Sequence, residues 1–172
     1  MAVRTILRYG HPDLLRVSKI VDDPCDQKIK QLVEDMVDTM KAHDGAGLAA
    51  PQIGILKRVI VFGFERNERY PNAEPVPETV LVNPEYEPLD LTQEEDWEGC
   101  LSIPGMRGLV PRFAHIRYRG HDLEGNVISR EVTGFHARVV QHEMDHLNGI
   151  LYPFRIRDMK RFGFADSLPF EQ

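Results

Sequence analysis

The first strong hydrophobic pattern lies in the N-terminal third of the chain. Apolar side chains recur there at the spacing of one helix face, at Ile29, Leu32, Val33, Met36, Val37 and Met40. Asp23 followed by Pro24 is a favourable N-cap and first-turn pair, and Gly45 comes shortly after His43. The pattern therefore predicts an amphipathic helix that begins at Asp23–Pro24, ends near His43 and buries one face in the core.

Several later segments have the composition of β-strands. Arg58–Phe64 is rich in β-branched and aromatic residues and predicts a buried strand, whereas Glu65–Glu78 holds three prolines and many charges and predicts an irregular loop. Further strands are predicted around Thr79–Asn83, Leu109–Arg119 and Asn126–Val132. A turn at Leu123–Asn126 is expected to join the last two as a hairpin.

A second helical pattern begins at Thr133 or Gly134 and ends at Asn148–Gly149, a favourable C-cap pair. One narrow stripe of this helix holds Phe135, Val139, His142 and His146, and a second apolar stripe holds Val140, Met144 and Leu147. Because the helix is apolar over so much of its circumference, we expect it to be buried. Strands in runs with segregated helices predict an α+β fold with antiparallel or mixed sheets.

Length, charge and cysteine content narrow the class of protein. At 172 residues the chain is expected to form a single domain, residues 1–172. Its net charge of −6 argues against specific nucleic-acid binding. Two distant cysteines give no disulfide framework, the apolar runs are too short to span a membrane, and the N-terminus has no targeting pattern. We therefore expect a cytoplasmic protein that does not associate with membranes.

The segment Gln141–His146 carries the clearest chemistry, because it contains the pattern His-Glu-x-x-His within the second predicted helix. Residues four apart on a helix have Cβ atoms about 5–6 Å apart, so His142 and His146 can bind the same ion. Glu143 projects from the same helix, close to any water on that ion. The pattern predicts half of a metal site together with its general base.

A catalytic site of this kind needs a third protein ligand and one open position. Cys100, in the segment Glu98–Ser102, is the best candidate, because the other cysteine, Cys25, lies beside Pro24 with no histidine nearby. The segment Gly45–Gln52 is so rich in small residues that its backbone is expected to pass close to another group.

At these segments the sequence resembles the peptide deformylases, whose three signatures stand intact and in order at Gly45–Gln52, Glu98–Ser102 and Gln141–His146. The resemblance extends from Ile6 to about Tyr152. It implies sheets packed around a central helix that carries the metal ligands. It also implies that the chain removes the N-formyl group from the initiator methionine of nascent peptides and releases formate.

The resemblance further implies a catalytic set. Cys100, His142 and His146 would hold one divalent ion per chain, which we expect to be Fe²⁺, with Zn²⁺ and Ni²⁺ as alternatives. Hydroxide on that ion would attack the formyl carbonyl, with Glu143 as general base and then general acid. The Gln52 side chain and the backbone N–H of Leu101 would stabilise the oxyanion.

Four residues are expected to bind the substrate. Gly47 would lend its backbone, Phe135 and Val139 would line an apolar pocket for the methionine side chain, and Arg107 would contact the peptide backbone. Arg138 stands where many bacterial members of the family carry an apolar residue, which leaves the shape of the pocket open.

Structural alternatives exist for each assignment. The histidines, Phe135 and Val139 could be ordinary core residues, Cys100 an inert buried thiol and Gln52 a turn amide. Glu98 and Arg112 are predicted to form a structural ion pair or to support the metal ligands, rather than to be catalytic. Asp145 is either part of a polar stripe or a partner of a ligand.

Two other functions stay open at this point. A zinc peptidase with a different third ligand would cut internal peptide bonds, but no further ligand follows at a recognised peptidase spacing. A structural or sensing metal site would need four protein ligands, and only three are evident.

The segment after Tyr152 predicts no long regular helix. Its basic residues, Arg155, Arg157, Lys160 and Arg161, could contact ribosomal RNA transiently. A solvated tail, or one that docks on its own chain, is favoured.

Overall fold

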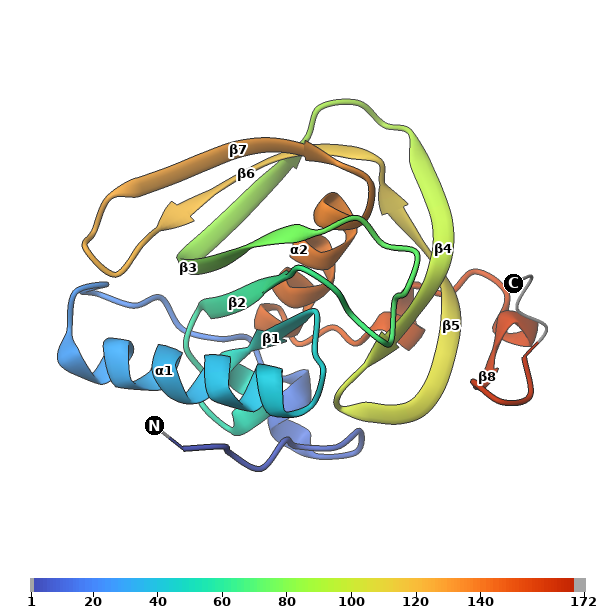
Figure 1. Cartoon of the computed structure of the whole chain (residues 1–172), viewed down its shortest axis with the longest axis horizontal. Helices are drawn as coiled ribbons and strands as arrows, with labels where there is room; N and C mark the ends of the chain where they lie inside the picture. The colour runs from blue at the N-terminus through green and yellow to red at the C-terminus, as the bar shows by residue number, and fades with distance from the viewer. Residues whose placement is uncertain (1, 169–172) are drawn as a thin grey trace.

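Two antiparallel sheets enclose one buried helix, α2 (Gly134–Leu147), in the computed structural model, which describes residues 2–168. Figure 1 shows α2 behind β2 and β3, with β6 and β7 passing over one end of it. The predicted α+β class and the central position of this helix are confirmed. The predicted domain, 1–172, extends past the described residues at both ends.

The larger sheet has five strands in the order β1-β2-β3-β6-β7. Their bounds are Gly47–Ala49 for β1, Val59–Phe64 for β2, Val76–Pro88 for β3, His115–His121 for β6 and Val127–Thr133 for β7. Every neighbouring pair is antiparallel, as in the register of Val61 with Val80 and of Tyr118 with Arg130. Its inner face packs against α2 through Ile60, Leu81 and Ile116, each fully buried.

The smaller sheet has the order β4-β5-β8. Its strands are Gln93–Cys100, Ile103–Phe113 and Phe162–Phe164. β4 was not predicted, because its first four residues are polar and exposed and show no alternation. The predicted strand at Leu109–Arg119 is two strands in the structure, β5 and β6, which belong to different sheets and are separated at Ala114.

The first helix, α1 (Gln27–Ala42), begins later than the sequence predicted. Its N-cap is Asp26, whose carboxylate accepts the N–H of Lys28 at 2.8 Å. Asp23 instead accepts the N–H of Cys25 at 2.8 Å and forms a separate turn before the helix. The apolar stripe is placed as predicted, with Val33, Met36 and Met40 buried against β1 and β2.

Four short 3₁₀ helices complete the described elements. They are η1 (Pro12–Leu15), η2 (Ala50–Ile53), η3 (Tyr152–Arg155) and η4 (Met159–Arg161). None of the helices among residues 2–168 is both long enough and apolar enough to cross a membrane.

The C-terminal segment docks on its own chain. Arg155 forms two hydrogen bonds to Asp145, Arg157 reaches Gln93 and Glu95 on β4, and the Arg161 guanidinium lies 5.5 Å from the centre of the Trp97 ring. The favoured alternative of a docked tail therefore holds for three of its four basic residues.

Candidate active site

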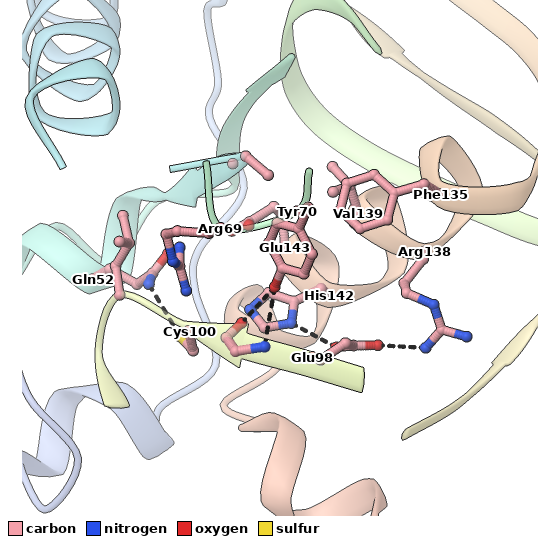
Figure 2. Close-up of a pocket in the computed structure, with 14 residues that line it drawn as sticks. Gln52, Arg69, Tyr70, Glu98, Cys100, Phe135, Arg138, Val139, His142 and Glu143 are labelled. Atoms are coloured by element: carbon pink, nitrogen blue, oxygen red, sulfur yellow. Dashed lines mark hydrogen bonds and ion pairs between the residues drawn. The ribbon is translucent and has the colours of Figure 1, made fainter. Parts of the chain in front are cut away.

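Three donor groups from two distant parts of the chain meet at α2, and Figure 2 shows two of them, Cys100 and His142. The last residue of β4, Cys100, and two residues of α2, His142 and His146, place their ligand atoms within 4.8 Å of one another. All three residues are buried. A gap of this size accommodates one ion, because metal–sulfur and metal–nitrogen bonds are about 2.3 and 2.0–2.1 Å long.

The two histidines present the correct ring nitrogens. His142 Nδ1 lies 2.8 Å from Glu98 Oε1, which leaves Nε2 free to face the donor group. His146 Nε2 already lies 3.3 Å from the sulfur of Cys100. A carboxylate on the far nitrogen of a metal-ligating imidazole fixes its orientation and its tautomer, so Glu98 positions His142.

The electrostatics of the site favour a thiolate. Burial by itself would raise the pKa of the Cys100 thiol, but the adjacent His146 and His142 side chains hold that pKa well below its usual range. Burial likewise opposes charge on His142, yet its hydrogen bonds with Cys100 and Glu98 raise its pKa well above the usual value. The deprotonated sulfur is the form that binds metal ions.

Glu143 lies beside this group with one oxygen unused. Its Oε2 is buried and has no hydrogen-bond partner among the described residues. Desolvation raises the pKa of Glu143 to about 6, partly offset by the two histidines. A carboxylate with a free oxygen and a pKa near neutrality is suited to accept and return a proton.

Gly47 leaves the space that Glu143 occupies. A Cβ atom at Gly47 would lie 2.5 Å from Glu143 Oε1, closer than carbon and oxygen can approach. The small-residue segment Gly45–Gln52 is therefore backbone that passes close to a neighbour, as the sequence predicted. Its β1 and η2 place the side chain of Gln52 in the site.

The Gln52 amide is held in one orientation. Its Oε1 accepts the N–H of Ala49 at 2.8 Å, which turns Nε2 toward Cys100 Sγ at 3.5 Å and Ser102 Oγ at 3.2 Å. Leu101 follows Cys100 in the turn between β4 and β5 and lines the same pocket. Both predicted oxyanion donors thus lie at the donor group, although their role stays a prediction.

A buried network of charges supports α2 from behind. Glu98 accepts two hydrogen bonds from Arg112 and one from Arg138, and Arg112 also pairs with Asp145. Burial would raise the pKa of Glu98, but Arg112 and His142 lower it far below its usual range. The predicted Glu98–Arg112 ion pair is confirmed, and it belongs to a larger network that Arg155 joins through Asp145.

The apolar end of the pocket lies away from the donors, where Phe135 and Val139 line it as predicted. Tyr70 and Arg69, which the sequence did not single out, also line the pocket, with Tyr70 next to Phe135. The Tyr70 ring centre is 4.7 Å from that of Phe135, and its hydroxyl bonds to the backbone of Gly99. Both residues sit in a charged, proline-rich loop, where no periodicity distinguishes them.

Arg107 lies beside the pocket, against Tyr70 and Gly99, and its contact with the peptide backbone stays a prediction. Its guanidinium lies 4.4 Å from the centre of the Tyr70 ring and donates to the carbonyl of Arg69 at 2.7 Å. It is not among the residues that line the pocket. In this structure Arg107 therefore holds the loop that carries Tyr70.

The fold and the site together define a candidate hydrolase centre built around one metal ion, with Cys-His-His donors and an adjacent carboxylate on a buried helix. The sequence profile described as polypeptide deformylase matches residues 3–162. The chain belongs to the polypeptide deformylase family.

Individual relatives agree with this membership. Peptide deformylase 1 of Nitrosomonas europaea is 58% identical over 166 residues, covering 96% of this chain and 94% of the relative. Peptide deformylase 2 of Ralstonia nicotianae is 57% identical with the same coverage. Among solved structures, a Met-Ala-Ser-bound class I type b peptide deformylase from Acinetobacter baumannii superposes with a TM-score of 0.86 at 38% identity, covering 90% of this chain and 99% of that one.

Proposed function

We propose that this chain removes the N-formyl group from the methionine that begins a nascent peptide, and that Cys100, His142 and His146 hold the divalent ion that the reaction needs. This deformylation is the activity of the family, and the family is metal-dependent. The observation that carries the proposal is the convergence of these three buried donors beside a carboxylate with a free oxygen.

The donor set fits a catalytic ion. One thiolate and two imidazoles leave a fourth position open, and they suit Fe²⁺, Zn²⁺ or Ni²⁺, of which we favour Fe²⁺. When bound, such an ion acts as a Lewis acid that lowers the pKa of water from 15.7 to about 7. The histidines depress the Cys100 pKa and Cys100 in turn raises the pKa of His142, so the sulfur is present as thiolate and metal binding would release the proton from the imidazole.

Glu143 moves the proton. Its pKa of about 6 lets it accept a proton from the attacking water near neutral pH, and deliver that proton to the amine that leaves. Because Glu143 Oε2 has no other partner among residues 2–168, this oxygen is available for the transfer.

Gln52 and Leu101 orient the formyl carbonyl. Gln52 Nε2 is aimed at the donor group by the Ala49 hydrogen bond, so the side chain needs no rearrangement when negative charge develops on the carbonyl oxygen. The backbone N–H of Leu101 is the second donor. Water is kept from the rest of the site by the burial of the ligands and of Gln52.

The substrate backbone fits between two free strand edges. β1 is an edge strand of the larger sheet and β4 an edge strand of the smaller one, and Gly47 and Gly99 from these strands face the same pocket. An extended peptide can add to such edges by main-chain hydrogen bonds. Its methionine side chain would then enter the apolar end of the pocket, beside Phe135 and Val139.

The test is formate release from formyl-Met-Ala-Ser by protein purified without oxygen, with bound metal measured on the same sample. We expect turnover that is lost on chelation and restored by Fe²⁺, Ni²⁺ or Zn²⁺. Cys100→Ala should lose metal and activity together. Full activity in that variant, or cleavage of internal bonds in unformylated peptides, would instead support a zinc peptidase with another third ligand.

Formylmethionyl peptides are thus the partners we propose. Transient contact with the ribosome and a cytoplasmic location stay predictions from the sequence.

A further inference from the structure

A second groove, of about 620 Å³, opens directly beside the candidate active site. Three residues, Arg69, Cys100 and Leu101, line both the groove and the pocket, so the two cavities are continuous. The remaining lining residues come from the N-terminal segment, the end of α1 and the β5 strand: Val3, Arg4, Thr5, Ile6, Arg8, His43, Pro104 and Gly105.

The charge of this groove is opposite to that of the chain. The described lining includes Arg4, Arg8 and Arg69 but no aspartate or glutamate, although the whole chain carries a net charge of −6. Arg4 has a carboxylate partner, Asp35, at 3.7 Å. Within residues 2–168, the guanidiniums of Arg8 and Arg69 form no ion pair and donate no hydrogen bond. The Arg69 guanidinium lies 5.7 Å from the centre of the Tyr70 ring. Two cations without a carboxylate partner therefore line a groove that has no acidic side chain in its described lining.

Arg8 is held in place although its segment has neither helix nor strand. The N–H of Leu7 donates to the carbonyl of Gln52, and the N–H of Tyr9 donates to the carbonyl of Ser102, both at 2.8 Å. Arg8 lies between these two hydrogen bonds. Its backbone is therefore fixed to the segments of Gln52 and Leu101, which carry the proposed oxyanion donors. Arg69 is attached through its carbonyl, which accepts a hydrogen bond from Arg107 at 2.7 Å.

The direction of the substrate leads into this groove. The formyl carbonyl is placed at Cys100 and Gln52, and the methionine side chain at Phe135 and Val139 on the other side of the site. Figure 2 shows Arg69 toward the Gln52 side of the pocket, away from Phe135. A peptide that continues beyond its second residue advances about 3.3 Å per residue, so it reaches Arg69, which lines both cavities, within a few residues.

We propose that this groove binds the part of the nascent peptide that follows its second residue, and that Arg8 and Arg69 make the enzyme prefer acidic side chains there. The proposal rests on the proposed deformylase function. Because both arginines are partly or fully exposed to solvent, the attraction acts through screened charge–charge contacts rather than a buried ion pair.

The experiment compares kcat/KM for three peptides with amidated C-termini: formyl-Met-Ala-Ala-Glu-Glu, formyl-Met-Ala-Ala-Gln-Gln and formyl-Met-Ala-Ala-Lys-Lys. At low ionic strength we expect the glutamate peptide to exceed the glutamine peptide by about five-fold, and the lysine peptide to be the poorest. Raising the salt to about 0.5 M should compress these differences, because the Debye length becomes shorter than the separations involved.

Arg8→Gln and Arg69→Gln should each reduce the ratio of glutamate to glutamine peptide, and the double variant should bring it near unity. Arg66→Gln is the matched control, because Arg66 is exposed on the same loop as Arg69 but does not line the groove. It removes the same charge and should leave the ratio as it is in the parent enzyme.

Equal kcat/KM for the three peptides would overturn the proposal, and so would a preference that survives in the double variant or one that Arg66→Gln abolishes equally. Formyl-Met-Ala ends before the groove, so it distinguishes a failure of the proposed deformylase function from a failure of the groove assignment. If it releases no formate, the proposed function itself fails. If it is turned over while the longer peptides show no charge preference, only the groove assignment fails.

Discussion

The two α-helices within residues 2–168 are buried in different ways. α1 buries six of its sixteen residues, mostly apolar, and leaves its other face in solvent. α2 buries eleven of its fourteen residues, and six of these are polar or charged: Arg138, Gln141, His142, Glu143, Asp145 and His146. α1 is held by ordinary apolar packing, whereas α2 places inside the protein the groups that do chemistry.

The comparison of α1 with α2 shows that a helix with buried polar side chains needs hydrogen-bond partners from other elements. An unpaired polar group inside a protein costs several kcal/mol, so each buried polar residue of α2 needs a partner from another element. Gln141 bonds to both backbone groups of Phe113, and Arg138 bonds to Glu98 and to two backbone carbonyls. Glu143 Oε2 and His146 Nδ1 are the exceptions on α2 among the described residues, and both belong to the candidate site.

Glu143→Gln separates chemistry from structure on α2 and should give the largest effect. Gln keeps the shape of the side chain but cannot accept the proton, so kcat for formyl-Met-Ala-Ser should fall by about 10³-fold. Metal content, measured by elemental analysis, should stay at the parental level, because Glu143 is not a ligand in our proposal. Near-normal kcat in a metal-loaded Glu143→Gln protein would remove Glu143 as the general base.

Glu98→Ala should show how much the network behind α2 contributes. It leaves the buried side chain of Arg138 without its carboxylate, Arg112 with Asp145 as its remaining carboxylate partner, and His142 without its Nδ1 partner. We expect a loss of about 3–5 kcal/mol in the free energy of unfolding, measured by urea denaturation of the metal-free protein.

The matched control for Glu98→Ala is Glu87→Ala, because Glu87 forms ion pairs with Arg117 and Arg119 at the surface. Such exposed pairs contribute about 0–1 kcal/mol. Similar losses for the two variants would mean that the buried network has no special weight in stability.

Met36→Ala tests α1, the helix that is held by apolar packing. The Met36 side chain is fully buried beneath α1, so its truncation should cost about 2–4 kcal/mol through lost burial and a residual cavity. Because Met36 does not line the pocket, kcat of the folded variant should be largely unchanged. Glu34→Ala, on the exposed face of the same helix, should alter stability by less than about 0.5 kcal/mol. A large loss of kcat in folded Met36→Ala would show that the packing of α1 also affects catalysis, contrary to this comparison.

His136→Phe should give the smallest effect, one that depends on pH. Burial, with a contribution from Arg130, lowers the pKa of His136 to about 4, below the value near 6.5 expected when the chain is unfolded. The unfolded chain therefore takes up a proton first, and stability present above pH 6.5 is lost as the pH falls toward 4. Allowing for its partial exposure, this loss is about 1–2 kcal/mol.

The measurement for His136→Phe is the urea midpoint of the metal-free protein between pH 7 and pH 4.5. Phe cannot titrate and still packs against Phe62 and Tyr118, whose rings contact His136. The variant should lose less stability than the parent over this range. An unchanged slope would assign the acid sensitivity to other groups.

The sequence by itself determined the parts of this protein that depend on neighbours in the chain. Helical spacing placed the stripe of α1 and the whole of α2. The pattern His142-Glu143-x-x-His146 placed two donors on one face of α2 with a carboxylate beside them. The α+β class and family membership followed from segments that the comparisons and the fold confirm.

Only the tertiary structure decided which distant polar residues meet. Asp23 looked like the N-cap of α1, but Asp26 serves, because both make nearly equivalent local turns. β4 carries no hydrophobic alternation, yet its pairing with β5 brings Glu98 and Cys100 to α2. Tyr70 and Arg8 belong to segments whose residues look like surface loop. Their positions depend on long-range contacts, and the physical reason they escape prediction is that a polar side chain has the same local pattern whether it faces water or a partner far along the chain.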